Sequence, residues 1–111
     1  MTAFEKIKSA LDPLGIPVTP DFFGGGAAEW ITYNEAGDFG RDDGDDAPGC
    51  NLVGVQIHYF LPMSRDYLEN KRAIRHALRA AGFTYPSVTV ITDKELDTRH
   101  IIYECEITEE V

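Results

Sequence analysis

Residues 50–86 read CNLVGVQIHYFLPMSRDYLENKRAIRHALRAAGFTYP, and the periodicity of this stretch changes once, from that of a strand to that of a helix. Residues 51–61 alternate with a period of two, which places two sets of side chains on opposite faces of a strand. A helix would not separate these residues so cleanly, so we expect one long strand. One face carries Val53, Val55, Ile57, Tyr59 and Leu61, and the other carries Leu52, Gln56, His58 and Phe60.

A helix is predicted directly after this strand. Pro62 has no N–H to donate and should end the ladder, and Ser64 is a favourable N-cap. Residues 65–81 have helical spacing, and Gly82 stands where a left-handed C-cap is favoured. The apolar stripe of this helix consists of Tyr67, Ile74, Ala77, Leu78 and Ala81.

The N-terminal residues predict a second, shorter helix. Thr2 and Glu5 have the spacing of a capping box, and apolar residues follow at helical intervals. The helix should end near Asp12, because Pro13 disfavours helical backbone at the residue before it.

The remaining segments predict strands, and together they define the fold class. Residues 29–34 alternate as a strand, residues 16–19 form at most a short edge strand, and residues 87–92 and 99–108 should pair as a hairpin. We therefore expect an α+β fold in one domain, residues 1–111. It should be a two-layer sandwich with a mostly antiparallel sheet of about four strands and two helices on one face.

Charge and composition exclude several classes of protein. The net charge of −9 argues against a nucleic-acid binder, because neutralisation of phosphates supplies most of that affinity. No apolar run approaches the roughly 18 residues of a membrane-spanning helix, and the N-terminus has no apolar core of a signal peptide. Cys50 and Cys105 lie on expected strands, so we expect two buried free thiols.

Residues 35–49, EAGDFGRDDGDDAPG, are rich in aspartate and glycine and predict a mobile, negative loop between two strands. Asp42, Asp43, Asp45 and Asp46 are carboxylates of the kind that hard cations prefer. Their spacing lacks the alternating ligands and the distal glutamate of an EF-hand, so we expect a solvated loop and no metal.

No catalytic motif stands out. His58, His76 and His100 have no metal-ligand spacing, although His58 and His100 could be neighbours across strands on the outer face. We therefore expect no enzymatic activity and no cofactor. A metal-binding or small-molecule-binding α+β domain of the cytoplasm, using the aspartate loop or these two histidines, is kept as an alternative.

Arg72, Arg75 and Arg79 lie along one side of the predicted second helix at spacings of three and four. One interpretation is an ordinary solvated helix face. The other is a contact with an acidic surface of another copy, the aspartate loop being the obvious partner, which would favour head-to-tail rings.

Five segments resemble small tail proteins of siphophages and prophages: TAFEKIKSALDPLGIPV, EWITYNEAGD, VGVQIHYFLP, AGFTYPSVTV and TRHIIYECEI. The resemblance is to the tail terminator or tail completion family of minor tail proteins, which take part in head-tail joining. It implies a non-enzymatic subunit of a homo-oligomeric ring, expected to be hexameric, that caps the tail tube and joins it to the head. A head-tail connector subunit is the alternative within virion assembly.

The same resemblance implies the partners and the location. The partners would be further copies of the chain, the tail tube protein and the head-tail connector protein, with no membrane. The protein would assemble in the host cytoplasm and remain in the tail or neck of the virion. DNA would pass through the ring without specific binding. We therefore expect Asp42, Asp43, Asp45 and Asp46 to line the channel, because negative charge repels the passing duplex.

Overall fold

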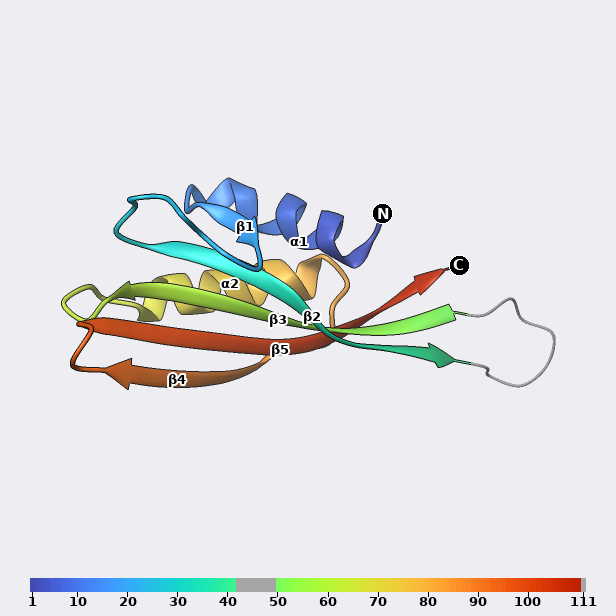
Figure 1. Cartoon of the computed structure of the whole chain (residues 1–111). Coiled ribbons are helices and arrows are strands. Elements are labelled where there is room, and N and C mark those ends of the chain that lie inside the picture. Colours follow the sequence, from blue (N-terminus) through green and yellow to red (C-terminus); the bar gives the residue numbers. More distant parts are fainter. Residues whose placement is uncertain (42–49, 111) are drawn as a thin grey trace.

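The computed structural model describes residues 1–41 and 50–110, in which a helix precedes three strands and a second helix precedes two more (Figure 1). One sheet of five strands has the order β1-β2-β3-β5-β4. The elements in chain order are α1 (Ala3–Leu11), the 3-10 turn η1 (Asp12–Leu14), β1 (Val18–Pro20), β2 (Trp30–Arg41), β3 (Cys50–Pro62), α2 (Leu68–Ala80), β4 (Ser87–Asp93) and β5 (Thr98–Glu110).

The sheet confirms the α+β class and the mostly antiparallel pairing, and it has five strands where about four were predicted. Four strands pair antiparallel, including the predicted hairpin of β4 and β5. The fifth, β1, pairs parallel with β2 over three residues. It is the short edge strand that the sequence allowed, and it stays short between Pro17 and Pro20, because proline cannot donate to a ladder.

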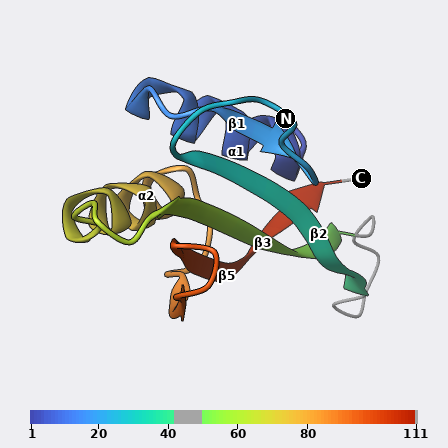
Figure 2. The ribbon, with the colours of Figure 1, turned by 60° about the vertical axis from the view of Figure 1, so that its left-hand side comes forward.

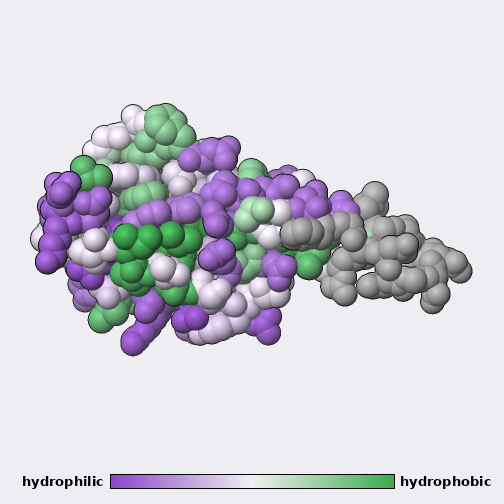
Figure 3. Space-filling model, turned by 60° about the horizontal axis from the view of Figure 1, so that its bottom comes forward, coloured by the Kyte–Doolittle hydropathy of each residue, from purple (hydrophilic) through white to green (hydrophobic). Residues whose placement is uncertain are grey.

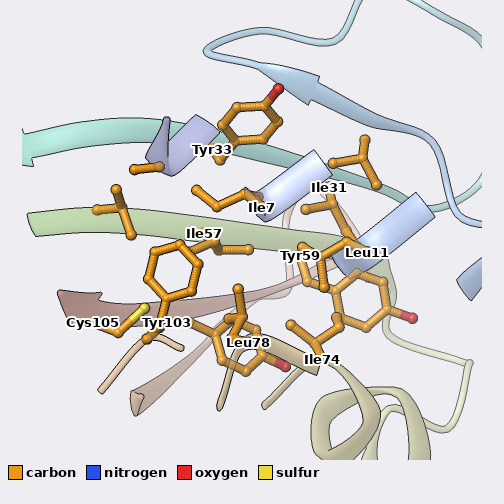
Figure 4. Packing of buried hydrophobic residues seen from close by; sticks show 14 of the residues in the cluster. Ile7, Leu11, Ile31, Tyr33, Ile57, Tyr59, Ile74, Leu78, Tyr103 and Cys105 are labelled. Atoms are coloured by element: carbon orange, nitrogen blue, oxygen red, sulfur yellow. The ribbon is translucent and has the colours of Figure 1, made fainter. Parts of the chain in front are cut away.

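Both helices cover the same face of the sheet (Figures 1 and 2). The predicted alternation of β3 is confirmed, because every second residue from Val53 to Leu61 is buried. These side chains pack against Ile7 and Leu11 of α1 and Ile74 and Leu78 of α2 in one cluster (Figure 4). Each fully buried aliphatic side chain stabilises the fold by about 1.5–3 kcal/mol. No helix in the described ranges is long and apolar enough to span a bilayer.

The C-terminal end of α2 agrees with the prediction from sequence, whereas its N-terminal end does not. Ser64 was predicted to be the N-cap, and this prediction was wrong. Ser64 lies instead in a turn in which the Arg65 N–H donates to the Pro62 carbonyl at 3.1 Å. The helix begins at Leu68 instead, whose N–H donates to Asp66 Oδ1 at 3.0 Å. At the other end Gly82 has φ of 104° and donates to Arg79, and Phe83 donates to Leu78. These two bonds form a Schellman motif, as the glycine predicted.

The prediction that all of residues 35–49 form a loop was wrong for its first half. Residues 35–41 continue β2, with a bulge between Glu35 and Gly37, and pair with the start of β3. Glycine and aspartate disfavour strands, but β3 and β5 extend in register to Cys50 and Glu110, and this pairing overrides local propensity. As a result β2, β3 and β5 reach beyond α2 (Figure 1).

Candidate assembly surface

The face of the sheet opposite the helices carries a row of large side chains that crosses four strands. Trp30 of β2 lies directly opposite Phe60 of β3, Phe60 opposite His100 of β5, and His100 opposite Ile91 of β4. The rings of Trp30 and Phe60 stack with centroids 5.3 Å apart, and those of Phe60 and His100 at 4.2 Å. We call Trp30, Phe60, His100 and Ile91 the aromatic row, after the three rings among them. Stacking of this kind adds about 0.5–1.5 kcal/mol per pair.

The row ends in an exposed apolar side chain on β4. Ile91 is 45% exposed on this face, whereas its neighbour Val90, 38% exposed, pairs with the buried Ile101 and points to the opposite face of the sheet. Figure 3 shows a hydrophobic area surrounded by hydrophilic residues on the side of the molecule where β4 lies. Exposed apolar side chains on an edge strand are typical of surfaces that contact another protein.

The two histidines expected to be neighbours do meet on this outer face. His58 Nδ1 and His100 Nε2 are 2.8 Å apart, and His58 Nε2 is 2.8 Å from Asn34 Oδ1. Asn34 Nδ2 donates to Gln56 Oε1 at 3.3 Å, so Asn34 Oδ1 accepts from His58 Nε2–H. His58 Nδ1 is then left to accept from His100 Nε2–H.

Burial favours the neutral form of both rings. Burial lowers the pKa of His58, and the negative charge of Glu104 partly offsets this shift. Burial also lowers the pKa of His100, and the nearby His58 lowers it further. The pair therefore ties β2, β3 and β5 together as a neutral network at pH 7. In residues 1–41 and 50–110 no three His, Cys, Asp or Glu side chains gather as a metal site.

The outer face of β5 changes from apolar to acidic along its length. We call His100, Ile102, Glu104 and Glu106, which point to this face in succession, the β5 strip. Glu104 and Glu106 are exposed. Gly54 lies opposite Glu106, and Gly37 lies opposite Gly54, so neither position fills the surface with a side chain.

A hollow of about 340 Å³ results at the acidic end of the strip, which we call the Gly54 hollow. Its rim includes hydroxyl groups and two carboxylates, so its chemistry suits a cation. The lining residues are Ala36, Gly54, Val55, Thr84, Tyr85, Ser87, Glu104, Cys105 and Glu106.

The three arginines predicted along one side of α2 follow an apolar residue on the same side, and Arg75 among them is half-buried. Leu68, Arg72, Arg75 and Arg79 follow at spacings of four, three and four, and we call them the α2 ridge. Arg72 and Arg79 are exposed, and Leu68 is 47% exposed. The apolar member was not part of the prediction, although its spacing from Arg72 places it on the same face.

Arg75 also has a role within the chain. Its Nε donates to the Pro86 carbonyl at 3.0 Å, and its guanidinium lies 4.3 Å from the centre of the Tyr85 ring. Arg79 Nη1 donates a long hydrogen bond, 3.4 Å, to the Phe83 carbonyl. Within the described ranges the ion pairs are Lys8–Asp12 and Arg65–Glu29, and neither involves the ridge.

The other predicted site residues fall outside this surface. Asp42, Asp43, Asp45 and Asp46 lie outside the described residues. Cys50 and Cys105 are free, and Cys105 is buried as expected, while Cys50 is only half-buried. Burial raises the pKa of the Cys105 thiol to about 12, so this sulfur stays protonated and unreactive.

No protein-family model matches the chain, and no curated protein sequence matches it. A similar solved structure is a chain of the "Virion of native gene transfer agent (GTA) particle". The two chains are 11% identical, with a TM-score of 0.60, over 97% of this chain and 91% of that chain. The protein therefore shares its fold, over almost its whole length, with a chain of a gene transfer agent virion.

Proposed function

We propose that the protein is a structural component of a phage or phage-like virion, and that it acts by binding other subunits rather than by catalysis. The observation that carries the proposal is the similarity in fold to a virion chain at a TM-score of 0.60 over nearly the full length of both chains. The outer sheet face adds support: within the described residues Phe23 stacks on the Trp30 end of the aromatic row, but Ile91 at the other end is 45% exposed and the acidic hollow is open to solvent.

Within a virion, the role we propose is that of a tail terminator or tail completion subunit. Copies would form a ring, of six in our proposal, that caps the tail tube and meets the connector of the head. The five segments that resemble this family support the finer assignment. The α2 ridge and the β5 strip support a ring, because they lie on different elements and carry opposite charge.

The acidic segment has a place in this proposal through its charge. Asp42, Asp43, Asp45 and Asp46 contribute four of the negative charges in a chain of net charge −9. Carboxylates along a channel would repel a DNA backbone and let it pass. The alternative of a metal-binding domain gains no support from the histidines, because His58 Nδ1 already accepts a hydrogen bond from His100.

The test is to remove the gene from the genome that encodes it and to examine the particles produced. We expect mass spectrometry to find the chain in wild-type particles. Without it, we expect electron microscopy to show heads and tails that remain separate, with tails of irregular length, because an uncapped tube continues to grow. A connector subunit would instead leave tails of normal length. Complete particles that form without the chain would refute the whole proposal.

A further inference from the structure

We infer that the α2 ridge of one copy docks along the β5 strip of a second copy, with Arg72 at Glu104 and Arg79 entering the Gly54 hollow beside Glu106. The inference rests on the proposed function, which requires self-association, and it names the two surfaces that would meet.

The two surfaces have the same order of polarity. The ridge begins with Leu68 and continues with arginines, and the strip begins with His100 and Ile102 and continues with glutamates. Laid side by side, apolar meets apolar at one end, and positive meets negative at the other. Complementary charge of this kind both attracts the correct partner and fixes its register.

The lengths of the two surfaces also match. Eleven residues of helix separate Leu68 from Arg79, which is about 16 Å at the helical rise. Four residues of strand separate Ile102 from Glu106, about 13 Å, and six separate His100 from Glu106, about 20 Å. A helix along the strip therefore reaches the Gly54 hollow with Arg79 while Leu68 lies between Ile102 and His100. Arg72, about 10 Å before Arg79, then lies about 4 Å beyond Glu104, an offset that its long side chain can span.

The hollow can accept a side chain because Gly54, which lines it, has no side chain, and neither has Gly37, its partner in β2. A Cβ placed on Gly54 would lie 3.8 Å from the nearest atoms, the backbone N and O of Gly37, which is ordinary van der Waals contact without a clash. The Glu104 and Glu106 carboxylates are exposed there, and in the described part of the chain neither takes part in an ion pair. A guanidinium is a planar donor that suits two carboxylates.

The geometry favours a head-to-tail contact. The ridge lies on a helix of the covered face, and the strip lies on the opposite face of the sheet. Among the described residues, Tyr85 alone lines both the Gly54 hollow and the hollow beside Arg72 and Arg75. Each copy can therefore offer its ridge to one neighbour and receive the ridge of another, which is the arrangement that builds rings.

Charge reversal tests the pairing of Arg72 and Glu104. Arg72 makes no hydrogen bond or ion pair in the described part of the chain, so its substitution should leave the fold intact. We expect R72E and E104R each to weaken self-association by about tenfold or more, measured by sedimentation velocity over a range of concentrations. The combined variant R72E/E104R should recover most of the loss, because the pair is restored with reversed sign.

Lys94→Glu is the matched control, because it makes the same charge change as R72E on an exposed residue of the turn between β4 and β5. We expect it to weaken association much less than R72E. Equal weakening by K94E and R72E, no recovery in the combined variant, or a wild-type chain that stays monomeric at every concentration would each overturn the inference.

Gly54→Val tests the hollow itself. A Cβ at Gly54 makes only ordinary contacts and valine favours strands, so the melting temperature should not fall, whereas the filled hollow should exclude Arg79 and weaken association by about tenfold. Unchanged association with a filled hollow would refute the placement of Arg79.

The inference and the proposed function can fail separately. If the chain is found in particles but none of these variants changes its self-association, the inference alone is refuted. Recovery by R72E/E104R in a chain that is absent from particles would refute the proposed function alone.

Discussion

At the scale of single residues, the neutral His58–His100 pair couples the stability of the sheet to pH. Folding buries both rings and lowers the pKa of each below the ordinary value of 6.5. The folded chain then binds fewer protons than the unfolded chain as the pH falls, so the free energy of unfolding decreases with falling pH. The contribution of the two histidines to the free energy of unfolding is complete above about pH 6.5. It is lost as the pH falls through their pKa values in the folded chain.

The prediction is that the denaturant midpoint of the wild type is lower at about pH 5 than at about pH 7, and that H58N/H100Q removes part of this difference. Carboxylates that titrate at lower pH remain in both proteins and serve as the internal reference. An identical pH dependence of the wild type and the variant would show that the pair contributes nothing to it.

Gly82 is a residue whose conformation only glycine adopts easily. Its φ of 104° completes the Schellman motif at the end of α2, and an added Cβ would also lie 3.6 Å from Ile107 Cδ1. We predict that Gly82→Ala lowers the free energy of unfolding by about 1 kcal/mol or more. Gly26→Ala, in open space without a positive φ, is the control and should change stability little. Equal effects on the denaturation midpoint would contradict this role of Gly82.

At the scale of elements, α2 has a buried side that holds the fold and an exposed side that is available to partners. Ile74 and Leu78 are fully buried against the sheet, and Tyr103 Oη donates to the Lys71 carbonyl at 3.0 Å, which joins the helix to β5. Burial raises the pKa of Tyr103 far above its usual value, so the hydroxyl remains a donor at any physiological pH. The two sides can therefore be separated by mutation.

We predict that Leu78→Ala costs about 2–5 kcal/mol of stability, because it leaves a cavity in the core. Leu68→Ala makes the same chemical change on the same helix at a residue that is 47% exposed, and it should cost less than about 0.5 kcal/mol. Chemical denaturation of the two variants measures the difference. Under the proposed docking, Leu68→Ala should nevertheless weaken self-association. Similar losses of stability for the two variants would contradict the assigned burial.

The elements that could be predicted from sequence are those whose local pattern agrees with their tertiary surroundings. The alternation of β3 and the capping box of α1, with Glu5 N–H donating to Thr2 Oγ1 at 3.2 Å, appear where they were expected. The extension of β2 through residues 35–41 could not be predicted, because glycine and aspartate favour turns and only pairing with β3 makes them a strand. The arginines of the ridge could be predicted because helical spacing alone places them on one side of α2. The aromatic row and the Gly54 hollow could not, because they depend on a register between strands that the sequence does not specify.

At the scale of the whole molecule, the proposed ring requires a chain of net charge −9 to associate with its own copies. Repulsion between like-charged copies acts over the Debye length, about 10 Å at 0.1 M salt, whereas a direct pair such as Arg72 with Glu104 acts at contact. A local pair of opposite charge on an acidic protein therefore selects one orientation while the rest of the surface resists random aggregation. The outer sheet face, which carries both the aromatic row and the glutamates, is where these requirements can be met together.

The two contributions can be separated by salt, because R72E and K94E have the same net charge. General repulsion affects both variants equally, so the ratio of their association constants reports the local pair alone. We predict that K94E associates about tenfold or more tightly than R72E at low salt, and that the ratio falls towards one near 1 M salt, where the Debye length is about 3 Å. Sedimentation velocity at a series of salt concentrations measures the ratio. If it does not change with salt, Arg72 acts through packing of its aliphatic portion and not through its charge, and the pairing with Glu104 is wrong.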